Sequence, residues 1–160
     1  MAVGVSTQPA LPCCERAACW SGRPDPRVRA VAEIVVESLA KEQALDVTAL
    51  VRQAVKRDSV ASGLCQLFVP HTTAAVTVNE GHDPDVMADL MAHLARLVPP
   101  NRGYRHGEGN SDAHIKAVLV GSSLTLPVVG GEVVLGRWQS VFLCEFDGPR
   151  HRRLLINVFG

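Results

Sequence analysis

The sequence lacks both a long hydrophobic run and an excess of charge of either sign. No apolar run approaches the ~18 residues that a helix needs to cross a bilayer, so we expect no membrane partner. Lys and Arg together number 16, as do Asp and Glu, which leaves a formal net charge of zero at pH 7. No basic run extends beyond 150–153, and the electrostatic footprint of a nucleic-acid-binding protein is therefore missing. The sequence predicts a small molecule or another protein as partner.

The chain also lacks an even number of cysteines, and no secretory signal precedes those that it has. Five cysteines are present, and an odd number without a signal peptide predicts a reducing compartment and a cytoplasmic location. Cys65 and Cys144 lie in apolar stretches. We expect them to be buried and inert, which is the common state of a free cysteine in a folded domain.

Regular structure is not expected in the first part of the chain. Residues 1–27 show no hydrophobic periodicity, and Pro12, Pro24 and Pro26 would interrupt any helix or strand. We predict a disordered extension over 1–27 and one folded domain over 28–160. A chain of 160 residues can bury a sizeable core in a single domain without disulfides.

From residue 28 onward, hydrophobic periodicity predicts a series of strands and helices. Asp83 and Pro84 are typical of a helix start, and Gly130 followed by Gly131 is typical of a hairpin turn. Asp46 is a candidate N-cap for an earlier helix. Strands are predicted over 29–39, 64–69, 71–79, 123–128, 132–135, 139–146 and 152–159, and helices over 47–57, 83–98 and 112–120.

The stretch 69–80, VPHTTAAVTVNE, has the most unusual side chains of the chain. In an extended conformation successive side chains point to opposite faces, so one face would be apolar and the other polar. The polar face would carry His71, Thr73, Ala75, Thr77 and Asn79. A solvent-facing antiparallel strand would explain this pattern. A face without Lys or Arg is also suited to an ion or a small polar ligand.

Further polar residues lie at the ends of predicted elements or on unexpected faces. Glu145 shares its strand face with apolar neighbours, and a buried carboxylate needs a partner. Asp89 and His93 are spaced i, i+4, which is typical of a solvated helix face. The candidate set comprises His71, Asn79, Glu80, Asp89, His106, Glu108, Asn110, His114 and Glu145.

Histidines and carboxylates together suit zinc and other divalent metals, although the spacing of these histidines matches no short metal-binding motif. The first turn of the predicted 112–120 helix is a natural anion site, with Lys116 near it. A metal beside an anion site would suit a small phosphorylated molecule.

Several blocks closely resemble the YjbQ family, also called the secondary thiamine-phosphate synthase family. They are HTTAAVTVNEGHDPDV (71–86), DAHIKAVLVGSSLTLPV (112–128), GRWQSVFLCEFDGPR (136–150) and the Arg-rich final strand. The resemblance covers about residues 28–160. It departs from the family at the 1–27 extension, at the short glycine-rich 105–111 loop, and at His82, which we leave out of the site.

The resemblance implies a fold and an assembly. The fold is a single compact α+β domain, with a largely antiparallel or mixed β-sheet packed by two or three helices. The assembly is a homotrimer with sites near subunit boundaries. The resemblance also implies a metal pocket built by His71, His106 and His114. The divalent metal cofactor would be zinc or magnesium.

The expected activity is a weak or secondary thiamine-phosphate synthase reaction, which joins hydroxymethylpyrimidine diphosphate to thiazole phosphate. We assign catalytic roles to Asn79, Glu80, Asp89 and Glu145, and ligand or cofactor binding to Asn110, Ser111 and Lys116. Two alternatives stay open at this point. One is a metal- or ligand-binding trimer that acts as a carrier or regulator without turnover, and the other is a metal-dependent hydrolase.

Overall fold

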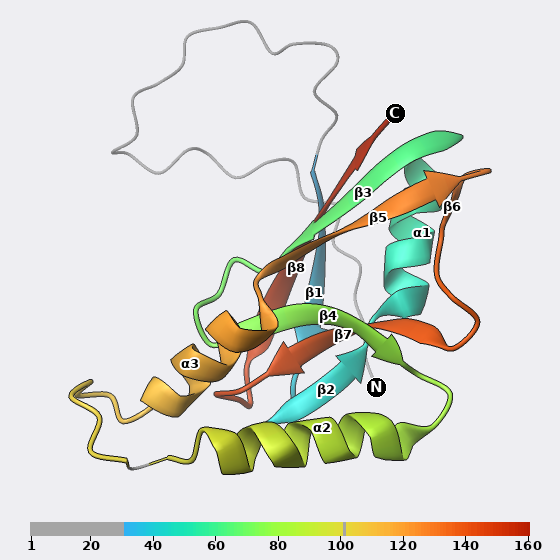
Figure 1. Cartoon of the computed structure of the whole chain (residues 1–160). Coiled ribbons are helices and arrows are strands. Elements are labelled where there is room, and N and C mark those ends of the chain that lie inside the picture. The colour runs from blue at the N-terminus through green and yellow to red at the C-terminus, as the bar shows by residue number, and fades with distance from the viewer. Residues whose placement is uncertain (1–30, 101) are drawn as a thin grey trace, which may run out of the picture.

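The computed structural model describes residues 31–100 and 102–160. The predicted 1–27 extension lies outside these ranges. The described chain forms two antiparallel sheets and three helices, and the α+β class is confirmed (Figure 1). None of the helices in the described ranges is long and apolar enough to cross a membrane.

The larger sheet has five strands in the order β1-β8-β3-β5-β6. These strands are β1 (Ala32–Glu37), β8 (His151–Phe159), β3 (Ser62–Phe68), β5 (Ser123–Val129) and β6 (Glu132–Val133). Every pair is antiparallel. Gly130 and Gly131 connect β5 to β6 with φ of 62° and 78°, a left-handed conformation that glycine adopts without steric cost. The predicted hairpin turn is confirmed.

The smaller sheet has three strands in the order β2-β7-β4. They are β2 (Gln43–Asp46), β7 (Gln139–Glu145) and β4 (Ala74–Glu80), again all antiparallel. The sequence did not predict β2, because a strand of four residues is too short to show a period. The predicted single sheet is therefore two sheets.

Three helices cover the sheets. They are α1 (Thr48–Asp58), α2 (Pro84–Leu97) and α3 (Ser111–Val120). In Figure 1, α2 runs along the lower side of the three-stranded sheet, α3 lies beside β4, and α1 packs near β6. The Asp83 side chain accepts a hydrogen bond from the Asp85 amide over 2.9 Å, which confirms the predicted start of α2. The α1 start differs by one residue, since Val47 is the cap and Asp46 Oδ1 accepts from the Thr48 amide.

Two hydrophobic clusters make the core. The larger one fills the space between the sheets and α1, and includes the fully buried Leu67, Leu143 and Ile156. The smaller one lies between the three-stranded sheet and helices α2 and α3, and includes Ala75 and Phe142. The three-stranded sheet is consequently buried on both faces.

This packing corrects the expected polar strand face. His71 is not part of a strand, because β4 begins at Ala74 and residues 71–73 form a turn before it. Ala75 is fully buried in the second cluster rather than on a wet or ligand-binding face. Thr77 and Asn79 lie further along β4 and are half-buried.

Cys65 and Cys144 are free and buried, as predicted. Burial, helped by the nearby charge of Asp58, raises the pKa of Cys65 to about 11. Burial also raises the pKa of Cys144 to about 12. Both thiols are therefore protonated and unreactive at neutral pH.

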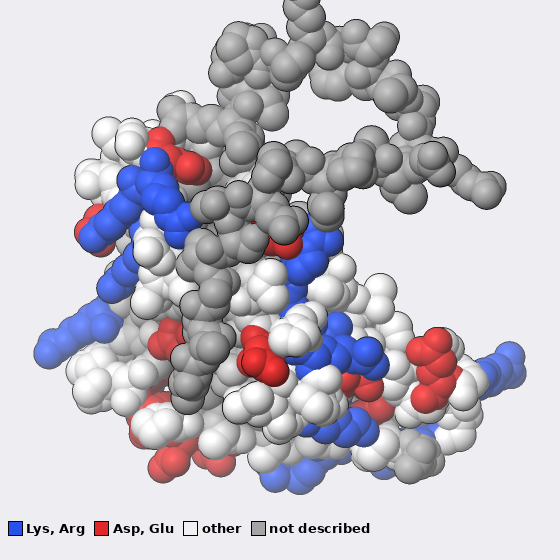
Figure 2. Space-filling model, turned by 180° about the vertical axis from the view of Figure 1, so that it is seen from behind, with Lys and Arg blue, Asp and Glu red and all other residues white. Residues whose placement is uncertain are grey.

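Charges of both signs are interspersed on the described part of the face seen in Figure 2. This distribution agrees with the balanced count of acidic and basic residues. No continuous basic surface is visible on that face among the described residues.

Candidate functional site

A cavity of about 740 Å³ lies between the loop that joins β3 to β4 and helix α3. We call it the histidine pocket, because His71 lines it from the loop and His114 lines it from the helix. Most of its wall is apolar and includes Phe68, Val69, Ala117 and Val118. The hydroxyl residues Thr72 and Ser122 also line it. Its volume is within the range of small-molecule sites.

The His71 ring is oriented by the backbone of β8. Its Nε2 atom accepts a hydrogen bond from the Arg153 amide over 2.8 Å. An acceptor nitrogen carries no proton, so the neutral ring holds its proton on Nδ1. No described residue accepts a hydrogen bond from Nδ1, and this donor is left for a ligand.

Burial lowers the pKa of His71, and the positive charges of Arg152 and Arg153 lower it further. The charge of Glu145 opposes this effect but does not outweigh it. The ring is therefore neutral at pH 7 and lies in a region of positive potential.

Arg152 and Glu145 form a buried ion pair whose charges act on His71. Arg152 Nε donates to Glu145 Oε2 over 2.6 Å, and the second arm of the guanidinium contacts Oε1 and the Thr73 hydroxyl. Both charged residues are almost completely buried. Ser38 donates a further hydrogen bond to Glu145 Oε2 over 3.0 Å. The expectation that Glu145 needs a partner is confirmed.

Burial alone would raise the pKa of Glu145, but the hydrogen bonds from Arg152, the Asp147 amide and Ser38 outweigh it and lower the pKa. Glu145 is thus charged at neutral pH and anchors Arg152. With its carboxylate enclosed by these donors, the geometry favours a structural role over the catalytic role that we assigned to it.

Lys116 occupies a second buried ion cluster. Its Nζ atom donates to Glu42 over 2.7 Å and to Asp112 over 3.0 Å, and its side chain is fully buried. Burial would lower the pKa of Lys116, but the two carboxylates outweigh burial and raise it. Because two carboxylates already neutralise this ammonium group, the geometry does not favour the predicted role of Lys116 in holding an anion.

The other two residues of that predicted anion site flank the start of α3. Asn110 is the N-cap residue without a side-chain cap hydrogen bond, and its Nδ2 atom donates to Asp147 over 3.1 Å. Ser111 is half-buried. Asp112 places a carboxylate in the first turn, where it takes up the favourable interaction that an external anion would have with the helix dipole.

The structure brings two of the three predicted metal ligands near one another. The rings of His106 and His114 meet edge to face with centroids 5.3 Å apart, and His106 Nε2 lies 3.7 Å from Glu108. The third residue, His71, uses its Nε2 to accept from Arg153.

The predicted metal pocket is therefore wrong. Across residues 31–100 and 102–160, no group of three His, Cys, Asp or Glu side chains is arranged to hold a metal ion. His71, His106 and His114 do not fit a zinc or magnesium centre, and we derive no chemistry through one. The metal-binding carrier and the metal-dependent hydrolase depended on this pocket and are corrected with it.

The remaining predicted catalytic residues lie outside the histidine pocket. Asn79 and Glu80 are half-buried at the end of β4, where Asn79 Oδ1 accepts from the Glu80 amide over 2.8 Å. Asp89 is exposed on α2. None of the three lines the pocket.

Sequence reasoning missed several residues around the histidine pocket and around a second cavity. Thr72 and Ser122 line the histidine pocket, and only their position next to predicted elements could have indicated them. Arg52, Arg137 and Trp138 line a second cavity. The available signal in the sequence was a tryptophan next to an arginine.

The family model described as "UPF0047 protein YjbQ-like" matches residues 32–160. A UPF0047 protein of Methanocaldococcus jannaschii, MJ1081, is 42% identical over 78% of this chain and 91% of its own length. The UPF0047 protein YugU of Bacillus subtilis is 36% identical over 78% of this chain and 96% of its own length. The resemblance seen in the sequence blocks is confirmed.

Solved structures of the same family superpose closely. A YjbQ/UPF0047 protein of Clostridium acetobutylicum gives a TM-score of 0.79 at 42% identity, covering 81% of this chain and all of that chain. A YbjQ-like protein of unknown function from Sulfolobus solfataricus gives a TM-score of 0.79 at 33% identity. The match covers 82% of this chain and 96% of that chain.

These relatives carry UPF0047 names or are described as of unknown function, and none of these names contains a reaction. Together with the missing metal pocket, this overturns the expected thiamine-phosphate synthase activity. The comparisons do establish kinship, since the match extends through both sheets and all three helices. The chain belongs to the UPF0047 protein family, the YjbQ-like proteins.

Proposed function

We propose that the histidine pocket binds a small phosphorylated molecule that has an apolar body. The observation that carries the proposal is the composition of the pocket. Imidazole and hydroxyl residues share one cavity of about 740 Å³ with an apolar wall. A pocket with a few polar groups and an apolar wall suits a ligand with one charged group and one apolar part.

Electrostatics supports an anionic group near His71. Arg152 and Arg153 lower the pKa of this histidine, which means that they produce a positive potential at its ring. A potential that opposes a proton there favours an anion at the same place. Both arginines are also paired with a carboxylate, Arg152 with Glu145 and Arg153 with Glu33. Of these two carboxylates, Glu145 is the one whose charge opposes the lowering of the His71 pKa.

Hydrogen bonding supports a phosphate in particular. The Nδ1–H group of His71 is a donor without a partner in the described chain, and Thr72, Ser122 and His114 add polar groups around the cavity. A phosphate has three acceptor oxygens and forms short, charge-assisted hydrogen bonds with such donors. The apolar part of the ligand would pack against Phe68 and Val118.

The experiment is a calorimetric titration of the full chain with phenyl phosphate, in the presence of a chelator. Benzyl alcohol, which has no charge, and inorganic phosphate, which has no apolar part, serve as ligand controls. We expect phenyl phosphate to bind more tightly than either. His114→Gln should weaken binding by about tenfold, the effect of losing one charge-assisted hydrogen bond.

His93→Gln is the matched control variant, because His93 is exposed on α2 and does not line the pocket. It should bind phenyl phosphate as the parent does. Equal weakening by His93→Gln and His114→Gln, or tighter binding of benzyl alcohol than of phenyl phosphate, would contradict the proposal.

A further inference from the structure

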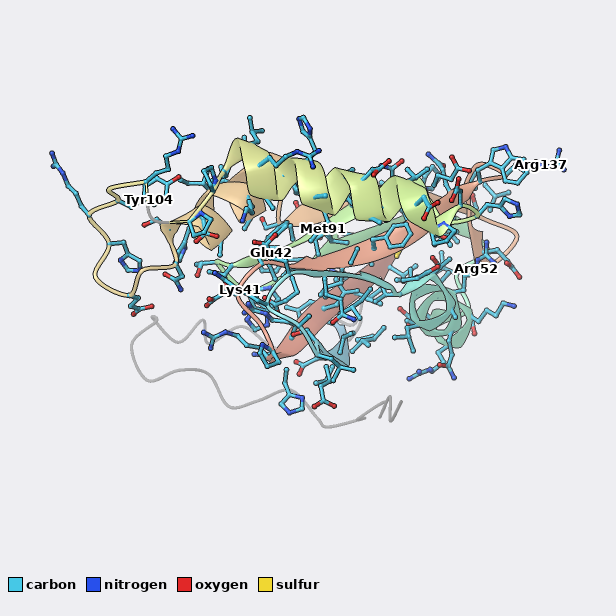
Figure 3. The ribbon with its side chains drawn as sticks, turned by 90° about the horizontal axis from the view of Figure 1, so that it is seen from below. Lys41, Glu42, Arg52, Met91, Tyr104 and Arg137 are labelled. Atoms are coloured by element: carbon cyan, nitrogen blue, oxygen red, sulfur yellow. The ribbon has the colours of Figure 1, made fainter. Side chains whose placement is uncertain are left out.

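A second cavity of about 740 Å³ opens between α1 and the segment that joins β6 to β7. It shares no lining residue with the histidine pocket. We call it the basic groove, because Arg52 and Lys56 line it from α1 and Arg137 lines it from the joining segment. Figure 3 shows Arg52 and Arg137 at the same end of the molecule, with Tyr104 at the opposite end.

The positive charge of the groove is only partly balanced. Asp46 is the one carboxylate among the described residues that line it, and its Oδ1 already accepts from the Thr48 amide over 2.8 Å. Lys56 lies 3.0 Å from Glu132 at the rim, with both side chains more than half exposed. Within residues 31–100 and 102–160, Arg52 and Arg137 form no ion pair with a carboxylate.

The Arg137 guanidinium is held in place before any ligand arrives. Its Cζ atom lies 4.7 Å from the centroid of the Trp138 ring, within the range of a cation–π interaction. The His82 ring packs against the same tryptophan with a centroid distance of 4.7 Å. Trp138 nevertheless remains 47% exposed.

The backbone around Trp138 is fixed as well. The Gly81 amide donates to the Trp138 carbonyl over 2.8 Å. Gly81 also approaches Ser140 so closely that a Cβ atom there would lie 2.1 Å from Ser140 Oγ. Gln139 closes the turn, since its side chain accepts from the Gly136 amide over 2.7 Å. The loop therefore presents Arg137 from a defined backbone.

We infer that the basic groove is a second ligand site, for a small molecule that carries a diphosphate group. Arg52 and Lys56 hold the anion from one wall and Arg137 holds it from the other. A guanidinium group can donate two parallel hydrogen bonds to two phosphate oxygens, and it stays charged at every physiological pH. The cations come from two walls of a cavity that has room for more than one phosphate, which favours a diphosphate over a single phosphate. Trp138 is a positioning residue for Arg137.

The experiment titrates the full chain with inorganic diphosphate in the presence of a chelator, and follows Trp138 fluorescence. The chain has two tryptophans, so the Trp20→Phe variant makes the signal specific to Trp138. We expect a saturable change. Arg52→Gln and Arg137→Gln should each weaken binding by about tenfold, the effect of removing one charged donor.

The matched control is Arg57→Gln, which removes the same charge from the same helix. Arg57 is exposed and does not line the groove, so this variant should bind diphosphate as the parent does. The role of Trp138 is tested by calorimetry. Trp138→Phe keeps an aromatic ring beneath Arg137 and should retain most of the affinity, whereas Trp138→Leu should lose as much as Arg137→Gln. Thermal melts of each variant confirm that it is folded.

Three results would overturn the inference. The first is the absence of a saturable fluorescence change. The second is equal weakening by Arg57→Gln and Arg52→Gln, which would indicate general attraction to surface charge. The third is loss of the Trp138 signal in His71→Gln, because that would place the anion in the histidine pocket instead. Failure of phenyl phosphate to bind the histidine pocket would leave the diphosphate titration unaffected.

Discussion

Arg152 holds the carboxylate of Glu145 with both arms of its guanidinium, and Nε lies 2.6 Å from Oε2. The pair connects β8 to β7, and so joins the larger sheet to the smaller one. Both side chains are nearly inaccessible to solvent. Ser38 and Thr73 complete the hydrogen bonding of the pair, so little of its polar surface remains unsatisfied.

Removing one partner of this pair should strongly destabilise the fold. Glu145→Ala leaves the Arg152 charge buried and unpaired, and should lower the free energy of unfolding by about 3 to 5 kcal/mol. Urea denaturation at pH 7 measures the change. The double variant Glu145→Leu, Arg152→Leu should be less destabilised than Glu145→Ala alone, because no buried charge remains. A double variant at least as unstable as the single one would contradict this reason.

Stability should also fall in acid because of Glu145. The folded protein lowers the pKa of this carboxylate, so its contribution is fully present above the unfolded pKa of about 4.3. The contribution is lost as pH falls from there through the folded pKa. Urea denaturation from pH 7 to pH 3 should show this loss. The same series on the double leucine variant should show a smaller decline.

Lys116 should behave in the opposite direction with pH. Its folded pKa is raised by Glu42 and Asp112 despite burial, so its stabilisation is present below the unfolded pKa of about 10.4 and declines as pH rises through the folded pKa. Lys116→Met leaves the buried Asp112 without its ammonium partner and should cost about 3 to 5 kcal/mol at pH 7.

Lys56→Met is the matched control for Lys116→Met. Lys56 also forms an ion pair, with Glu132, but both side chains are more than half exposed. Such surface pairs contribute less than about 1 kcal/mol. Equal losses in the two variants would show that burial does not decide the strength of these pairs.

Much of the fold could be predicted because its signals are local. Asp83 and Pro84 start α2, and Gly130 and Gly131 turn β5 into β6, through chemistry that lies within a few residues of chain. The strand β2 carried no such signal, and its pairing with β7 depends on residues about a hundred positions away.

The candidate sites were harder to predict because they depend on contacts distant in sequence. His71 looked like a metal ligand, but the Arg153 amide takes up its Nε2 atom from a strand that follows much later in the chain. Lys116 looked available for an anion in the sequence, but in the fold its ammonium group donates a hydrogen bond to Glu42, 74 positions earlier in the chain. Arg52 and Arg137 line the same cavity only because α1 packs near β6 and β7.

The homotrimer that the family resemblance implies stays a prediction. The outer face of the larger sheet exposes Leu64, Phe68 and Phe159, and Leu64 and Phe159 are paired neighbours on β3 and β8. Exposed apolar patches of this kind are typical of subunit interfaces. Light scattering should give three times the 17.2 kDa mass of the chain. Phe159→Asp should reduce that mass, and the parent mass of a single chain at micromolar concentration would refute the trimer.

The last prediction concerns how the histidine pocket responds to pH. Burial and the charges of Arg152 and Arg153 lower the pKa of His71 in the free protein. A bound phosphate would add negative charge beside the ring and raise that pKa. Protonation takes place at Nε2 and breaks its hydrogen bond from the Arg153 amide. It is still coupled to binding because the bound phosphate raises the pKa, so phenyl phosphate affinity should increase as pH falls from 8 toward 6.

The ligand itself gains a proton near pH 6 and would weaken the effect. His71→Gln separates the two contributions, because the glutamine cannot gain a charge while ionisation of the ligand is unchanged. Its side-chain oxygen can also replace Nε2 as acceptor for the Arg153 amide. The ratio of parent to variant affinity should therefore rise as pH falls, and calorimetry at several pH values measures it. A ratio that stays constant would mean that the phosphate binds away from His71, and the proposed orientation of the ligand in the pocket would be wrong.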